Sequence, residues 1–114
     1  MSTVVEVNTS ANPAFFTLPD GVSLTAIKTS SYQAVAGDLV RCDPTGGAFP
    51  VLLPAAPAKD DVVAVKNQSA SASAITITPG AGHTIDGAAT LVINFARGAY
   101  TVQFDGTSDW MVTA

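Results

Sequence analysis

Two stretches, Asp61-Val62-Val63-Ala64-Val65-Lys66-Asn67 and Ala74-Ile75-Thr76-Ile77-Thr78, decide the fold class of this 114-residue chain. The second stretch alternates strictly, which predicts a strand with Ile75 and Ile77 directed inward and its threonines outward. The first is apolar on both faces through its middle, which predicts a strand at the centre of a sheet or at a subunit contact. A turn of small residues separates them. Both stretches therefore favour β structure.

Working outward, further short apolar runs of period two are separated by turn residues along the whole chain. One Glu, three Lys and two Arg leave few strong polar helix formers, and seven Pro and nine Gly interrupt any longer element. The pattern is typical of an all-β fold, and we expect a small antiparallel β-sandwich or barrel-like domain. The further expected strands cover residues 3–7, 21–28, 39–42, 48–54, 90–95, 100–104 and 110–112.

Turns and breakers refine this prediction. Pro50 cannot donate a hydrogen bond to a neighbouring strand, so its strand is expected at a sheet edge. Residues 43–47 read as a turn, and residues 105–109, which begin with Asp-Gly, read as a hairpin loop. Residues 55–60 are the best candidate for a short helical turn.

The N-terminal part of the chain reads differently from the rest. We expect residues 1–30 to form an extended attachment arm and residues 31–114 to form the β-domain. The adjacent Phe15 and Phe16 place one ring on each face of an extended chain, and with Leu18 they are candidate contacts to a neighbour. The alternative is that the chain's own domain covers both rings.

Composition limits the possible functions. Charged residues make up 12% of the chain, against about 25% in typical soluble domains, and the net charge is −4. The acidic balance argues against nucleic acid and against an anionic membrane surface as partners. A surface so poor in charge is a solubility risk, so we expect copies of the chain or another protein to cover much of it. The N-terminus lacks the features of a signal peptide, which favours synthesis in a cytoplasm.

Candidate chemistry is sparse. Cys42, the only cysteine, excludes an intrachain disulfide and is expected to be a small buried hydrophobe. His83 is the only histidine, so a metal site or an acid–base pair with Asp86 lacks a third partner nearby in the sequence. The Asp60-Asp61 pair reads as a solvated turn. We therefore expect no enzymatic activity, no metal and no cofactor, and we assign Trp110 to the core rather than to a sugar site.

Residues 32–114 carry a series of motifs whose order resembles a known family. The motifs are Gly46-Gly47-Ala48-Phe49-Pro50-Val51-Leu52-Leu53-Pro54, Val62-Val63-Ala64-Val65-Lys66-Asn67, Ile75-Thr76-Ile77-Thr78-Pro79, Thr84-Ile85-Asp86-Gly87 and Asp105-Gly106-Thr107-Ser108-Asp109-Trp110. This order resembles the small β-domain of tailed-bacteriophage virion proteins, which include capsid decoration proteins, head fibres and tail fibres. Pro50 departs from the pattern, where a β-branched or polar residue is more usual.

The resemblance implies a homotrimer without catalytic residues, located on the capsid exterior after synthesis in a bacterial cytoplasm. With so short a segment before the β-domain, a capsid decoration (cement) protein or short head fibre fits best. Its expected partners are itself and the major capsid protein or another virion protein. A carbohydrate-binding host-attachment module using Trp110 or Tyr100, or a tail fibre or baseplate subunit, stays as an alternative. The expected capsid or subunit interface comprises Phe15, Phe16, Leu18, Val62, Val63 and Val65.

Overall fold

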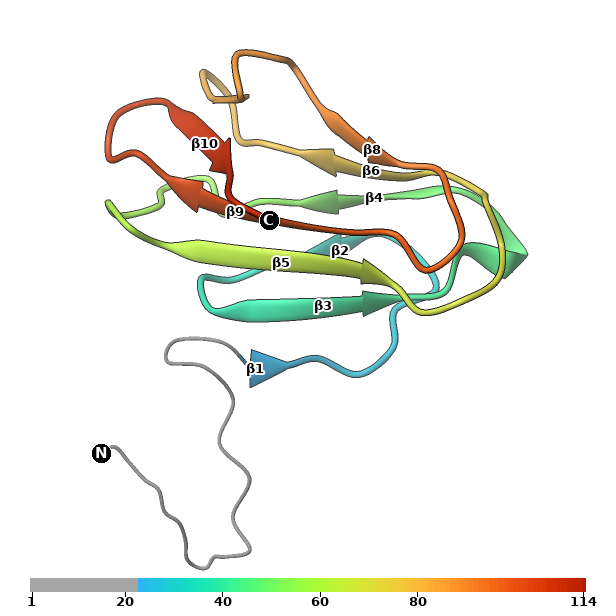
Figure 1. Cartoon of the computed structure of the whole chain (residues 1–114). Helices are drawn as coiled ribbons and strands as arrows, with labels where there is room; N and C mark the ends of the chain where they lie inside the picture. Colours follow the sequence, from blue (N-terminus) through green and yellow to red (C-terminus); the bar gives the residue numbers. More distant parts are fainter. Residues whose placement is uncertain (1–22) are drawn as a thin grey trace, which may run out of the picture.

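The computed structural model describes residues 23–114, which form two β-sheets layered face to face (Figure 1). The six-stranded sheet contains, in order, β1 (Ser23–Leu24), β3 (Asp38–Cys42), β5 (Val62–Asn67), β9 (Ala99–Phe104), β10 (Asp109–Val112) and β7 (Thr84–Ile85). The four-stranded sheet contains β2 (Tyr32–Gln33), β4 (Phe49–Leu52), β6 (Ile75–Thr78) and β8 (Leu91–Ile93). The all-β prediction is confirmed, as is the central position predicted for residues 62–67.

Strand direction corrects the prediction of an antiparallel domain. The pairs β1–β3, β3–β5, β2–β4, β4–β6 and β7–β10 are parallel, and only β5–β9, β9–β10 and β6–β8 are antiparallel. From β1 to β6 the chain alternates between the two sheets. Each return to the same sheet includes two reversals, so the next strand runs in the same direction as the last. The result is a coil closed by the antiparallel strands β8, β9 and β10.

The core lies between the sheets, where alternation directs every second side chain inward. Ile75 and Ile77 are fully buried, as predicted, and Trp110 is 0% exposed. The buried apolar residues are Ala34, Val40, Cys42, Phe49, Val51, Leu53, Val63, Val65, Ile75, Ile77, Ile85, Ile93, Val102, Phe104 and Trp110. They come from both sheets and form one contiguous cluster.

The edge-strand prediction for Pro50 is wrong, because β4 lies between β2 and β6. The amides of Phe49 and Leu53 donate to Ala74 O and Thr78 O beside β6. Alternation along the strand therefore turns the Pro50 nitrogen toward β2. Strand β2 begins only at Tyr32, which lies opposite Val51. No residue of β2 therefore lies opposite Pro50, and the missing donor of the proline breaks no hydrogen bond of this sheet.

Two further local predictions can be compared with the structure. Residues 55–60 form no helix; the short helical turn lies instead at η1 (Pro44–Gly46), inside the turn predicted for residues 43–47. There the side chain of Asp43 accepts a hydrogen bond from the Thr45 amide, and Pro44 supplies a preset first residue. The predicted loop at residues 105–109 joins β9 to β10 as a hairpin.

The beginning of the described chain follows the six-stranded sheet. Beyond β1, Lys28 forms a parallel bridge with Cys42, so residues 23–28, which the sequence assigned to the arm, lie along β3. Phe15, Phe16, Leu18 and the expected strand at residues 3–7 lie outside the described residues. Within residues 23–114, no helix has the length and apolar character needed to cross a membrane.

Candidate functional site

Among residues 23–114, the strand side chains on the outer face of the four-stranded sheet include no ionisable group. Register places Pro50, Thr76 and Val92 in one row across β4, β6 and β8, and the next row continues from Gln33 through Leu52 to Thr78. Val92 is 37% exposed, and Pro50, Leu52 and both threonines are half-buried. We call this surface the uncharged face: Gln33, Pro50, Leu52, Thr76, Thr78 and Val92. A partly apolar surface without charge suits contact with another protein.

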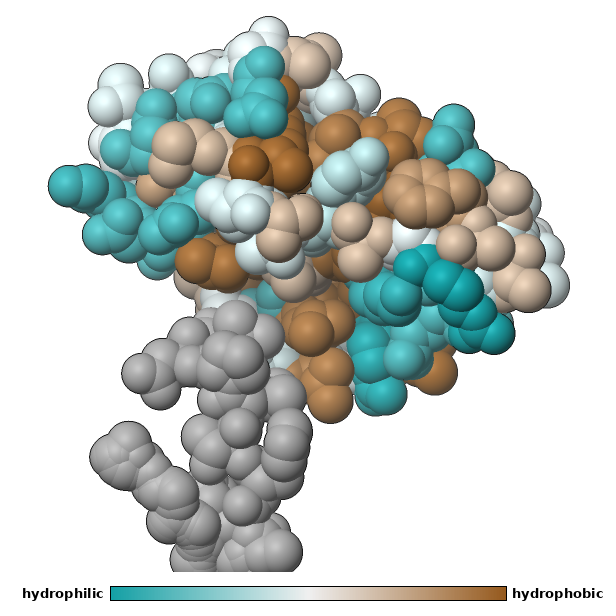
Figure 2. Space-filling model, in the orientation of Figure 1, coloured by the Kyte–Doolittle hydropathy of each residue, from teal (hydrophilic) through white to brown (hydrophobic). Residues whose placement is uncertain are grey.

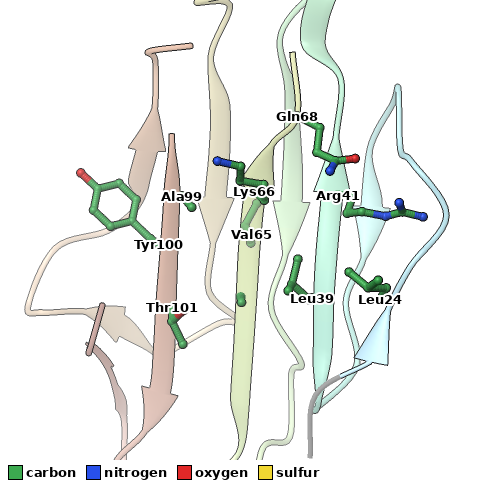
Figure 3. Close-up of a pocket in the computed structure, with 10 residues that line it drawn as sticks. Leu24, Leu39, Arg41, Val65, Lys66, Gln68, Ala99, Tyr100 and Thr101 are labelled. Carbon is green, nitrogen blue, oxygen red and sulfur yellow. The ribbon is translucent and has the colours of Figure 1, made fainter. Parts of the chain in front are cut away.

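The outer face of the six-stranded sheet holds a shallow groove of about 340 Å³ (Figure 3). Leu24, Leu39 and Ala64 form its apolar floor, and register aligns them with Thr101 across β1, β3, β5 and β9. Leu24 is 50% exposed. The groove is therefore an apolar strip that crosses four strands.

One end of this groove is basic. Arg41 and Lys66 lie directly opposite each other on β3 and β5, and both line the groove with Gln68. Figure 3 shows the two charged side chains close to the groove, on neighbouring strands. Arg41 Nε donates to Thr25 O at 2.8 Å, and Lys66 Nζ donates to Arg97 O. Both cationic side chains therefore donate to backbone carbonyls, which are neutral. These hydrogen bonds do not neutralise the positive charges.

Four carboxylates gather at the opposite end of the same sheet. Asp60 and Asp61 precede β5, Asp105 follows the antiparallel β9, and Asp109 begins β10. Asp61 accepts the Ala58 amide at 2.8 Å, and Asp109 accepts the Thr84 hydroxyl at 2.6 Å. These carboxylates cap loops, and the hydrogen bonds that they accept come from neutral donors.

Hydrogen bonding lowers the pKa of two exposed carboxyls. Asp105 accepts the backbone amides of Thr107, Ser108 and Asp109, and these bonds, with the nearby His83, hold its pKa below the usual value. Asp43 behaves in the same way, mainly through the Thr45 hydroxyl and amide. Both groups stabilise their loops in the ionised form.

The predicted interface residues of β5 fall on two faces. Val63 and Val65 are 0% and 1% exposed inside the chain's own core, so their side chains offer no surface to a partner. Val62 points to the other side and is half-buried. The remaining predicted interface residues, Phe15, Phe16 and Leu18, lie outside the described part of the chain.

The structure separates the other candidate residues. Trp110 is fully buried, which confirms the core assignment and removes it as an exposed platform for a sugar ring. Cys42 is buried, and burial raises the pKa of its thiol to about 12. The His83 ring packs against Phe104 in a tilted arrangement, with ring centroids 5.1 Å apart. In residues 23–114, no group of three His, Cys, Asp or Glu side chains could hold a metal ion.

Sequence reasoning missed both surfaces. Arg41 and Lys66 are far apart in the sequence and become neighbours only through the parallel β3–β5 pairing. The alternation of Thr76 and Thr78 with buried isoleucines was the signal for the uncharged face, but its continuation onto β4 was hidden by the expectation for Pro50. No protein-family profile and no curated protein matches the chain.

Proposed function

We propose that this chain is a structural protein of a tailed-bacteriophage virion, a capsid decoration protein or short head fibre that binds the outer shell. The observation that carries the proposal is the uncharged face, where two rows of side chains across the four-stranded sheet hold no charge. Charged residues are depleted from the centres of protein–protein interfaces. The resemblance of the motif order in residues 32–114 to the virion β-domain supports the same assignment.

The work of such a protein consists of contacts rather than chemistry. Pro50, Leu52 and Val92 would bury apolar area against the shell, and the two threonines on β6 offer hydroxyls between them. Figure 2 shows brown, white and teal residues interspersed on the side in view. Contacts of this kind across shell subunits would help the capsid to resist the pressure of packaged DNA. A trimer, as the resemblance implies, would present three such faces.

The test uses capsids of the bacteriophage that is proposed to encode this chain. The capsids are prepared without the chain. Purified chain is mixed with these capsids, co-sedimentation gives the affinity, and cryo-electron microscopy locates the added density. Val92→Lys should weaken binding at least about tenfold, because it buries a charge in the contact. Met111→Lys, on the other sheet and similarly exposed at 39%, is the matched control.

Two results would overturn the proposal. One is that the purified chain does not bind the capsids, or that its density is found only at the tail. The other is a Val92→Lys variant that binds as well as the Met111→Lys control, since the uncharged face would then not be the contact.

A further inference from the structure

Charge in the described residues is segregated along the strand axis of the six-stranded sheet. Lys28, Arg41, Lys66 and Arg97, four of the chain's five Lys and Arg residues, lie where β3 and β5 end and β9 begins. At the other end, where β5 and β10 begin, stand Asp60, Asp61, Asp105 and Asp109. We call these the basic end and the acidic end. Lys59 and Asp43 are the exceptions at the two ends.

The two ends are too far apart to neutralise each other within one copy. β5 has six residues, which at about 3.3 Å per residue separates the ends by about 20 Å. The screening length is about 8 Å at physiological ionic strength. Each end therefore presents its own field to solvent and to any approaching molecule.

The two ends also differ in form. The basic end opens into the groove, whose apolar floor of Leu24, Leu39 and Ala64 lies beside Arg41 and Lys66. The acidic end projects two exposed loops, with Asp60 in a turn at a φ of 72° and Asp105 at the start of the β9–β10 hairpin loop. Exposed acidic loops complement in charge a groove with a basic rim, and Lys59, which precedes Asp60, leaves the acidic residues in excess at this end.

We propose that the groove and basic end of one copy dock the acidic end of a second copy, so that copies associate head to tail. Charge complementarity identifies a second copy of the chain as the partner, because the basic end and the acidic end are both present on this chain. Such a contact uses two different patches, and therefore closes into a ring or continues as a filament. A ring of three contacts would give a trimer.

The test measures self-association of the full chain by sedimentation velocity over a range of protein concentrations, in low and in high salt. High salt should weaken association, because the charged residues of both ends are half-buried or exposed and salt screens charges that reach solvent. Arg41→Gln with Lys66→Gln removes the basic rim, and Asp60→Asn with Asp61→Asn removes the acidic loop charges. Each double variant should raise the dissociation constant at least about tenfold. Asparagine tolerates the positive φ of Asp60.

Mixing the two double variants is the sharpest arm. The first keeps an intact acidic end and the second an intact groove, so a one-to-one mixture should form heterodimers although neither variant associates alone. Lys59→Gln is the matched control, since it removes the same charge from the opposite end and should leave association intact or strengthen it. If Arg41→Gln with Lys66→Gln does not fold, Thr101→Glu places a repelling carboxylate in the groove instead.

The proposal is overturned if the chain is monomeric at every concentration in low salt. It is also overturned if association ignores both salt and the double variants, or if the mixture forms no heterodimer. Capsid binding is measured separately on the uncharged face, so failure of either proposal leaves the other decidable.

Discussion

Phe104 and Trp110 lie directly opposite each other across the β9–β10 hairpin, with ring centroids 5.2 Å apart. His83, in the loop before β7, packs against the same Phe104 ring in a tilted arrangement. Three aromatic rings from separate segments thus tie the C-terminal hairpin to the loop at the acidic end. Within the described residues, neither the Trp110 Nε1 nor the His83 Nδ1 has a hydrogen-bond partner. Packing rather than hydrogen bonding holds this cluster.

Trp110→Ala should therefore destabilise the fold severely. A fully buried aromatic residue truncated to Ala costs about 3–5 kcal/mol of unfolding free energy. Trp110→Phe should cost much less, because it keeps most of the ring volume and removes an N–H without an acceptor. Guanidinium denaturation measures both variants, and equal losses for the two would contradict the packing account.

Asn67 supports a hydrogen-bonded network that its substitution should break. It is 0% exposed, and its side-chain amide donates to Ser71 O and Phe95 O while its oxygen accepts from Ser69. Asn67→Ala removes four hydrogen bonds made by a fully buried side chain and leaves part-buried groups without these partners, so we expect a loss of at least about 2 kcal/mol. Gln68→Ala, at the next and exposed position, should change stability by less than about 0.5 kcal/mol. Thermal unfolding of the two variants provides the comparison.

Asp105 should make stability depend on pH in the acid range. Its pKa in the folded chain is lowered from the usual 3.8, so its contribution is complete above 3.8 and is lost as pH falls through the folded value. Asp105→Asn should flatten this part of the stability curve. Thr107→Ala keeps the backbone N–H that Asp105 accepts and should retain the slope. An unchanged slope in Asp105→Asn would show that other carboxyls dominate acid unfolding.

Cys42 should be inert in the folded chain. Burial holds its thiol pKa at about 12, so the reactive thiolate is scarce and shielded. A colourimetric disulfide reagent should label it only at the rate of unfolding, and should label it fully in denaturant. Rapid labelling of native protein would mean that the β3 end opens locally.

The sequence predicted which residues form strands far better than it predicted which strands pair with one another. Alternation in residues 74–78 identifies which side chains face the core, because period two is a local property of an extended chain. It carries no information on which strand lies alongside. The parallel pairing of Val65 with Val40 depends on a connection that crosses to the other sheet and back, so the antiparallel expectation failed.

Pro50 and the groove show the same limit. The proline rule is correct about the missing donor, yet the short β2 leaves a position in an inner strand where no donor is needed. Arg41 and Lys66 each look like an isolated charge near a strand end. Only the β3–β5 register makes them a pair, so the basic end could not be read from either segment alone.

The two ends of the described chain differ in how firmly they are joined to the six-stranded sheet. β1 has two residues and pairs only with β3, whereas β10 is held between β9 and β7. Tension applied through Ser23 would act on the short β1–β3 pairing alone. Tension applied through β10 would be shared by its pairings with β9 and β7. A pulling experiment should therefore detach residues 23–28 first, as a small early step, and leave the aromatic hairpin for the final rupture. The fold would thus unfold in stages under force, and the β1–β3 pairing would break before the rest of the sheet is loaded.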